Sequence, residues 1–373
     1  MVMKCHVIED IDNRFLKSEW RRLEREADAF PQNTYDWCAT WWRHLGSHRE
    51  LHVVMVLDED GQARGIVPLC IERHCGIRVL RSFPINYGDF FQIIVSPEAE
   101  EEDVFELALS YMAQCRRWRC VLLAPINDHS TLHAFLCRKG CESKLLVGNV
   151  VADIRADSWD EYLGRVSRNR RRLTHKKMRA LEGQYDVEVD VVGDRKGYVQ
   201  WFDRIREMVD ARGMRDRPKR SNAYMECVRE TNSHLFSTGQ MVLHLVKASG
   251  TVIAYRIGIV QGRTYYDWNT SYDTAWAQYS PGMLSVAYVI RSLIAEGFST
   301  LDFMAGVYDY KLSYSPKHEM RSNHLFVMGD GSIQSALIRK YQLAWRDQVR
   351  PYYHRFVRPV LNRRIPIRLR RSS

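Results

Sequence analysis

The run Ser280-Pro281-Gly282, directly before an apolar stretch with helical spacing, has the residue types of an anion-binding helix entrance. The first backbone N–H groups of a helix lack intrahelical acceptors, and the helix dipole places partial positive charge there. Proline is tolerated at the first helical position, glycine admits a ligand close to the backbone, and no acid follows in the first turn. Because phosphates bind at such ends, the run predicts a site for a phosphate-bearing acyl carrier, although it also fits an ordinary turn.

The neighbouring residues predict the elements that would position this entrance. We expect a strand over 265–269, a loop over 275–282, a helix that Met283 opens and Gly297 ends, and a strand over 300–305. Upstream, glycine turns separate three β-forming runs, over 241–247, 251–260 and 263–269. The pattern predicts an antiparallel meander that leads into a crossover helix and a further strand.

The first half of the chain predicts a similar order of elements. Its predicted strands cover 51–57, 63–71, 77–83, 120–123 and 144–151. Predicted helices cover 14–28, 35–45, 104–116 and 131–139 in the first half, and 159–181, 197–211 and 223–232 in the second. The sequence therefore predicts a pseudo-repeat. Tyr35, Trp37, Trp41 and Trp42 could line an acceptor cleft, but their spacing favours core packing.

Several short motifs occur in a fixed order along the chain. In the second half they are Tyr272-Asp273, Tyr279 to Gly282, Gly297, Leu301-Asp302-Phe303, Gly306 and Tyr310-Lys311. In the first half they are Gln32 to Trp37, Trp41-Trp42, Ile66 to Leu69 and Gly88-Asp89. Together they resemble the CelD/BcsL-type, FemAB-like acetyltransferases of the GNAT superfamily (BioF2-like acetyltransferase domain family). These bacterial proteins are often linked to exopolysaccharide or cellulose production.

The resemblance covers most of residues 14–315 and implies an α/β fold with two GNAT-like domains in tandem. Each domain would be a mixed, mainly antiparallel sheet flanked by helices. We expect a degenerate first domain at 1–152, an acyltransferase domain at 153–332, and a basic helix and tail at 333–373. The acids that follow the fourth strand of the first half, Glu98 to Asp103, would repel a pyrophosphate, so donor binding is expected only in the second half.

The resemblance also implies an acyl-CoA co-substrate, acetyl-CoA, and an amine or hydroxyl acceptor, without a metal. The expected donor-binding residues are Trp268, Asn269, Gln278, Tyr279, Ser280, Pro281, Gly282 and Met283. A backbone N–H near Trp268 and Asn269 would polarise the thioester carbonyl. The loop lacks the usual Gln/Arg-x-x-Gly-x-Gly/Ala spacing of the superfamily, and we interpret Gln278 to Gly282 as a variant of it.

Candidate catalytic residues are Asp273, Asp302, Tyr310 and Lys311. Asp273, Asp302 or a water could take the proton of the acceptor, and Tyr310 or Tyr279 could protonate the leaving thiolate. Lys311 could place a positive charge near the oxyanion or a carrier phosphate. Asp273 could instead cap the following loop, and Asp302 could face solvent or form an ion pair.

The formal net charge of +10 is concentrated in two clusters. One follows a predicted helix from Arg168 to Arg179, either as a solvated face or as a contact for phosphates of coenzyme A, an acyl carrier protein or an aminoacyl-tRNA. Related FemAB enzymes use the last donor, but no stacking aromatics interleave the cluster, which disfavours RNA. The second cluster, after Arg346, alternates arginines with apolar residues and could contact an anionic membrane surface.

Composition restricts the class of protein. With 373 residues and 45% hydrophobic content, the chain can bury more than one core. It contains no run of about 18 apolar residues and no apolar secretion core. Its nine cysteines form no Cys-x-x-Cys pair. These features predict a reduced, cytoplasmic protein, in contact at most with the inner face of the membrane. A non-catalytic scaffold in a polysaccharide-synthesis complex is the alternative from another functional class.

Overall fold

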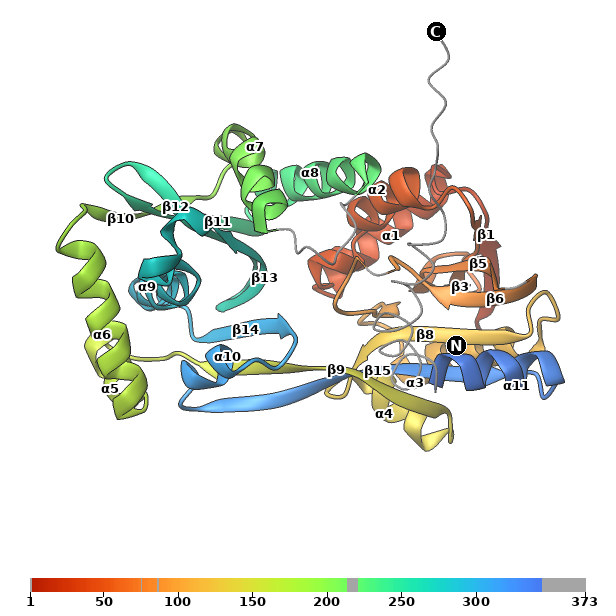
Figure 1. Ribbon diagram of the computed structural model, residues 1–373. Helices are drawn as coiled ribbons and strands as arrows, with labels where there is room; N and C mark the ends of the chain where they lie inside the picture. The colour runs from red at the N-terminus through yellow and green to blue at the C-terminus, as the bar shows by residue number, and fades with distance from the viewer. Residues whose placement is uncertain (1, 75, 86, 213–220, 344–373) are drawn as a thin grey trace, which may run out of the picture.

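The two halves of the chain repeat one order of elements in the computed structural model, which describes residues 2–74, 76–85, 87–212 and 221–343 (Figure 1). The first half contains β1 (Lys4–Ile8), α1 (Arg14–Glu26), η1 (Pro31–Asn33), α2 (Tyr35–Leu45), β2 (Glu50–Leu51), β3 (Val53–Leu57), β4 (Ala63–Val67), β5 (Leu69–His74), β6 (Ile77–Ser82), β7 (Ile94–Val95), α3 (Glu101–Gln114), β8 (Cys120–Asn127), α4 (Thr131–Arg138) and β9 (Glu142–Asp153).

The second half begins with two helices that have no counterpart in the first. It contains α5 (Trp159–Arg165), α6 (Arg168–Glu182), β10 (Val187–Val192), α7 (Arg195–Arg212), α8 (Asn222–Ser237), β11 (Met241–Ala248), β12 (Thr251–Gln261), β13 (Thr264–Tyr272), η2 (Thr274–Tyr279), α9 (Pro281–Ala295), β14 (Thr300–Ala305), α10 (Asp309–Ser313), β15 (His318–Gly329) and α11 (Ile333–Lys340).

Each half contains a four-stranded antiparallel set, β1-β3-β4-β7 in the first and β10-β11-β12-β13 in the second. A helix pair follows the first strand of each set, and a crossover helix follows the last, α3 in the first half and α9 in the second. The first half adds the hairpin β5–β6. This arrangement confirms the predicted pseudo-repeat and the predicted mixed, mainly antiparallel sheet with flanking helices.

The two halves exchange their last long strands. β9 from the first half pairs with β14 of the second, and β15 from the second half lies between β9 and β8. A single 11-stranded sheet results, in the order β10-β11-β12-β13-β14-β9-β15-β8-β6-β5-β2. Figure 1 shows β9 and β15 running along both halves. We did not predict β10, although its residues alternate apolar and acidic side chains (VEVDVV), or β15, which shows no such alternation along most of its length.

Several predicted elements differ in their boundaries, and three of them are divided or begin differently. The predicted strand over 63–71 is two strands, because Pro68 has no N–H to donate to a ladder; β4 joins one sheet and β5 the other. The predicted helix over 159–181 is interrupted, and the side chain of Ser167 caps α6 by accepting from the backbone N–H of Arg170. The predicted loop over 275–282 contains the 3-10 helix η2, and α9 begins at Pro281, two residues before Met283.

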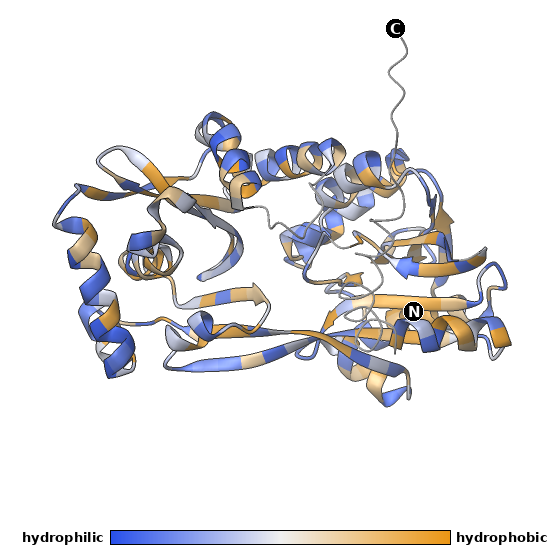
Figure 2. Ribbon diagram, in the orientation of Figure 1, coloured by the Kyte–Doolittle hydropathy of each residue, from blue (hydrophilic) through white to orange (hydrophobic). Residues whose placement is uncertain are grey.

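Of the four first-half aromatic residues, Tyr35, Trp37 and Trp41 belong to the core, as their spacing indicated, and Trp42 is partly buried against it. Tyr35, Trp37 and Trp41 are each exposed by 2% or less. The Trp37 ring lies 5.5 Å from the ring of Trp268 on β13, so this core joins the two halves. Figure 2 shows apolar residues concentrated on the strands and hydrophilic residues along α6. No helix in the described ranges is both long and apolar enough to span a bilayer, and the predicted basic tail after Leu343 lies outside those ranges.

Candidate active site

The start of α9 forms one wall of a cavity of about 370 Å³. Its lining consists of Arg256, Thr270, Tyr272, Ala277, Ser280, Pro281, Gly282, Met283 and Tyr310. The structure therefore brings together four of the residues predicted to bind the donor and one predicted catalytic residue. We call this space the donor-side cavity.

The backbone at the entrance of α9 is arranged for a ligand. Ser280 adopts a left-handed conformation (φ 61°, ψ 52°), and its side chain does not cap the helix. The N–H groups of Met283 and Leu284 donate to the Ser280 carbonyl at 3.0 and 3.1 Å, whereas no described hydrogen bond uses the N–H of Gly282. A Cβ at Gly282 would lie 3.0 Å from the ring of Tyr272, so glycine keeps this side of the cavity open. With no acid in the first turn, the entrance suits an anion.

Next to this entrance, β13 separates from β14. The two strands pair in parallel only from Thr264 to Tyr266, opposite Thr300 to Asp302. A register shift against β12 leaves Trp268 without a partner, which is a β-bulge. Beyond Tyr266, β13 therefore presents an edge that β14 does not cover, and backbone N–H groups on such an edge can bind a ligand. Trp268 and Asn269, predicted to polarise a carbonyl, lie in this stretch.

A buried ion pair adjoins the donor-side cavity through Arg256, which lines it. The Arg256 guanidinium donates to both carboxylate oxygens of Asp267, at 3.0 and 2.5 Å, and to the Ser285 hydroxyl at 3.1 Å. Both charged side chains are 3% exposed. Burial raises the pKa of Tyr310 in the same cavity, and the nearby charge of Arg256 opposes that shift. Tyr310 therefore keeps its proton at neutral pH and can donate it.

Lys311 on α10 and Asp302 within β14 are both buried, and Lys311 contacts the end of that strand. The Lys311 ammonium donates to the carbonyls of Phe303, Met304 and Ala305 at 2.7, 3.2 and 3.0 Å. Its three donors thus hold the end of the strand, and burial lowers its pKa to about 8. Asp302 is 2% exposed and accepts from the backbone N–H of Met304 at 2.7 Å. Burial raises the pKa of Asp302 to about 6.

A second cavity, of about 660 Å³, lies between the two halves. Its lining includes Tyr87 and Asp89 from the first half and Trp268, Asn269 and Ala305 from the second. Asp89 interacts electrostatically with both Lys311 and Asp302. Burial raises the pKa of Asp89 to about 6, while Gln32 and Lys311 act in the opposite direction. We call this space the inter-half cavity.

Five predicted site residues line neither cavity: Asp302 and Lys311, described above, and Asp273, Tyr279 and Gln278. Asp273 caps η2 by accepting from the N–H of Ala275 at 2.9 Å and pairs with Arg204 at 2.7 Å, as the capping alternative predicted. The Tyr279 hydroxyl donates to Gln184 at 2.6 Å. Gln278 is exposed, and its carbonyl accepts from Lys177 at 2.9 Å. Of the two tyrosines considered for protonating a thiolate, only Tyr310 faces the donor-side cavity.

Residues not predicted as site residues are Arg256, Thr270, Tyr272 and Asp89. The sequence contained one signal for Arg256 and Asp267, because each interrupts an apolar strand where a charge must be paired if it is buried. Asp89 was part of a recognised motif, but no local pattern indicated that it would meet β14. Tyr272 also belonged to a motif, without an assigned role.

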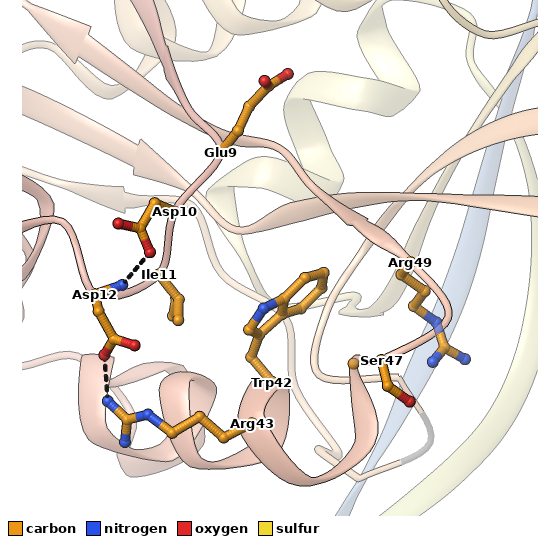
Figure 3. Close-up of a pocket in the computed structure, with 9 residues that line it drawn as sticks. Glu9, Asp10, Ile11, Asp12, Trp42, Arg43, Ser47 and Arg49 are labelled. Carbon is orange, nitrogen blue, oxygen red and sulfur yellow. Dashed lines mark hydrogen bonds and ion pairs between the residues drawn. The ribbon is translucent and has the colours of Figure 1, made fainter.

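The first half has a different pocket, of about 500 Å³, shown in Figure 3. Its charged side chains already have partners: Arg43 donates to Asp12 at 2.7 Å, and Glu9 accepts from Arg117 at 2.6 Å. The Asp10 carboxylate accepts from the backbone N–H of Asp12 at 3.0 Å. None of the lining residues belongs to a strand or to the first turn of a helix. It lacks the features that make the donor-side cavity a candidate site.

The basic cluster forms one face of α6. A hollow of about 450 Å³ there is lined only by Arg168, Arg171, Arg172, His175, Lys176 and Arg179. Lys177, on the neighbouring face, reaches η2 close to the start of α9. For metals, the described ranges contain no group of three or more His, Cys, Asp or Glu side chains arranged to hold an ion.

Comparison with known proteins identifies the type of domain. Residues 168–312 match the family model of the acetyltransferase (GNAT) domain. This range includes α6, the meander, the entrance of α9, β14 and Tyr310. No curated protein matches the sequence. The match supports an acyltransferase with a GNAT domain in its second half.

Solved structures of similar fold cover both halves. FemX aligns with a TM-score of 0.54 and 11% identity, over 92% of this chain and 100% of FemX. L-PGS from Bacillus licheniformis gives 0.53 and 12%, over 96% of this chain and 99% of L-PGS. The C-terminal domain of a putative lysylphosphatidylglycerol synthetase from Agrobacterium fabrum gives 0.53 and 12%, over 87% and 96%. The tandem arrangement is therefore a shared fold.

Proposed function

We propose that this protein transfers an acetyl group from acetyl-CoA to an amine or a hydroxyl acceptor. The observation that carries the proposal is the open, acid-free entrance of α9 next to the uncovered edge of β13. The GNAT domain match over the same residues supports it. We further propose residues 153–332 as the catalytic domain, completed by β9 from the first half, and residues 1–152 as the acceptor-side domain.

The proposed donor site uses backbone groups more than side chains. The N–H of Gly282 and the positive end of the α9 dipole bind a phosphate of the donor. An extended acyl carrier arm lies along the uncovered edge of β13, where backbone N–H groups near Trp268 and Asn269 polarise the thioester carbonyl. Tyr310 gives its proton to the departing thiolate. Lys311 acts indirectly, because its donors fix the end of β14.

The two cavities would hold the two substrates, with the acyl donor in the donor-side cavity and the acceptor in the inter-half cavity. The donor-side cavity contains Thr270 and Tyr310, and the inter-half cavity contains Trp268, Asn269 and Ala305. β13 contributes to both cavities, and the end of β14, which diverges from it, contributes Ala305 to the inter-half cavity. An acceptor in the inter-half cavity would approach the thioester carbonyl through this gap. A pure scaffold would not need an open helix entrance beside an uncovered strand edge.

The basic face of α6 favours a second candidate, an aminoacyl-tRNA-dependent transfer. Six basic side chains line one hollow on this face. A polyanion bound there would lie near η2, since Lys177 contacts Gln278. This candidate predicts tRNA binding that weakens steeply with salt. The similarity of the chain motifs to CelD/BcsL-type proteins is our reason to propose an acceptor from exopolysaccharide or cell-envelope synthesis.

Calorimetric titration with acetyl-CoA, free CoA and tRNA tests these candidates, with two variants at one position. Ser280→Asp adds a negative charge at the entrance, in a conformation that Asp tolerates, and Ser280→Asn is the uncharged control of the same shape. We expect Ser280→Asp to weaken acetyl-CoA binding at least tenfold, about 1.4 kcal/mol, and Ser280→Asn to leave it within about threefold. Absence of acetyl-CoA binding by the unchanged protein would refute the donor assignment, and salt-sensitive tRNA binding would then favour the second candidate.

A further inference from the structure

The wall of the inter-half cavity contains a carboxylate supplied by the first half. Asp89 lies in the segment between β6 and β7, and three hydrogen bonds from the buried η1 hold this segment. The N–H of Asp89 donates to the Gln32 side chain at 2.7 Å, Asn33 donates to the Phe90 carbonyl at 3.2 Å, and the N–H of Gln92 donates to Asn33 at 3.0 Å. Gln32 and Asn33 are fully buried. The position of Asp89 is therefore fixed before any ligand binds.

The charges around Asp89 leave an excess of negative charge. Asp302 interacts electrostatically with Asp89 and adds a second acid, whereas Lys311 supplies one positive charge to the pair. Arg321 also acts on Asp302, but its guanidinium pairs with Glu319 at 2.8 Å. Arg81 is the basic residue of the described lining, and it pairs with Glu72 at 2.6 Å. A cationic group on a ligand would balance the remaining charge.

Aromatic rings form another part of the same wall. The ring of Tyr87 lies 5.6 Å from that of Tyr224 and 6.2 Å from that of Trp268, and all three residues line the cavity. The faces of such rings attract ammonium groups and also pack against sugar or hydrocarbon rings. Carboxylates and aromatic faces therefore favour the same ligand class.

We propose that the acceptor is a primary amine, and that Asp89 binds its ammonium group in the inter-half cavity and takes its proton. This inference rests on the proposed function. The carboxylate of Asp89 takes one proton from the ammonium, and the neutral nitrogen attacks the thioester carbonyl carbon. The C–N bond forms and the C–S bond breaks with its electron pair on sulfur. The thiolate receives a proton from Tyr310, which is replaced by the second proton lost from nitrogen. The products are an amide, a free thiol and one released proton.

Two observations support proton transfer at this position. The desolvated position of Asp89 and its charged neighbours place its pKa at about 6, so it is ionised at neutral pH yet basic enough to accept a proton transiently. The cavity also includes Asn269 and Ala305, which lie where β13 and β14 diverge. The nitrogen bound by Asp89 thus lies on the acceptor side of the proposed thioester position.

The test measures thiol release from acetyl-CoA with matched acceptors, 2-phenylethylamine against 2-phenylethanol and glucosamine against glucose. We expect turnover with at least one amine and at most a tenth of that rate with its hydroxyl counterpart. Asp89→Asn should lower amine turnover at least thirtyfold while acetyl-CoA affinity stays within twofold. Asp89→Glu, which keeps the carboxylate, should restore part of the rate. Asp10→Asn, an exposed acid in the remote first-half pocket, is the control and should match the unchanged protein.

Each failure has a distinct meaning. Unchanged amine turnover in Asp89→Asn, equal rates for alcohols and amines, or no turnover of either class by a protein that binds acetyl-CoA would each overturn the inference. If Asp89→Asn fails to fold, Tyr224→Ala provides the test. Loss of the preference for amines in this variant would support amine binding in the inter-half cavity, and an unaltered preference would contradict it. Failure of the unchanged protein to bind acetyl-CoA would instead refute the proposed function itself.

Discussion

The helix α3 in the first half and the helix α9 in the second each follow the last strand of a four-stranded antiparallel set. The first turn of α3 carries Glu101, Glu102 and Asp103, whereas the first turn of α9 carries no acid. The adjoining strands differ as well: β7 has two residues, and β13 has nine, with a bulge. A helix entrance becomes an anion site only where its own side chains leave the charge uncompensated and the neighbouring strands leave space.

The strand that follows each crossover helix, β8 in the first half and β14 in the second, also differs in how its edge is covered. In the second half β14 pairs with β13 for three residues only, and the strands then diverge. In the first half the added strand β6 pairs in parallel with β8, while β7 belongs to the other sheet. The hairpin β5–β6 thus occupies the edge of β8 that corresponds to the open gap in the second half. We interpret the first half as a domain that shapes the acceptor side.

The largest expected difference between the halves concerns a buried arginine. Arg256→Met leaves Asp267 buried without its partner, which should lower the free energy of unfolding by about 3–5 kcal/mol. Arg64 on β4 is an arginine of the first half that pairs with Asp58 and Glu98. Arg64→Met should lower the free energy of unfolding by clearly less. Glu98 is exposed, and Asp58 still accepts a hydrogen bond from the backbone N–H of Gln62. Urea unfolding midpoints compare the two variants, and equal losses would contradict the distinction.

If the second half performs the chemistry, its two candidate tyrosines should separate in kinetics. Tyr310→Phe should lower the rate of thiol release about a hundredfold with acetyl-CoA affinity unchanged, because it removes the proton donor to the thiolate. Tyr279→Phe should retain the rate, since its hydroxyl donates to Gln184 outside the cavity. Rapid-mixing measurement of thiol release checks both, and similar rates for the two variants would argue against the role of Tyr310.

The acid that the first half supplies should appear in the pH profile. Asp89 accepts a proton only when ionised, so kcat/KM for the amine, which reports groups of the free protein, should fall about tenfold per pH unit below a midpoint near 6. Asp302, Lys311 and Gln32 face this carboxyl. Asp302→Asn removes a neighbouring negative charge and keeps an acceptor for the N–H of Met304, so it should shift the midpoint to lower pH. An unchanged midpoint would show that the charge of Asp302 does not affect the pKa of Asp89.

The smallest effect is expected at the entrance of α3. Replacing Glu101, Glu102 and Asp103 by their amides removes the repulsive charge but opens no cavity, because β6 still covers β8. Acetyl-CoA should therefore bind with an unchanged stoichiometry of one per chain. Loss of the acids from the first turn should lower stability by about 1 kcal/mol. Calorimetry and thermal unfolding measure both quantities, and a second binding equivalent would show that charge alone separates the halves.

Much of the donor side could be predicted from sequence because its signals are local. The positions of Pro281, Gly282 and Gly297 follow from the conformations these residues allow, and the predicted strand over 300–305 matches β14. Asp273 shows the limit of such reasoning. Its position suited either a base or a cap, and only the contacts with Ala275 and Arg204 distinguish them.

The sequence by itself determined the repeat, the crossover helices, and the contrast between the acidic entrance of α3 and the acid-free entrance of α9, since periodicity and charge are written in adjacent residues. Only the tertiary structure decided which distant residues share a site. Asp89 and Asp302 are separated by more than half the chain, and they meet because β9 and β15 are exchanged between the halves. Such pairing depends on which strand edges remain open after each half folds, and no local pattern encodes that choice.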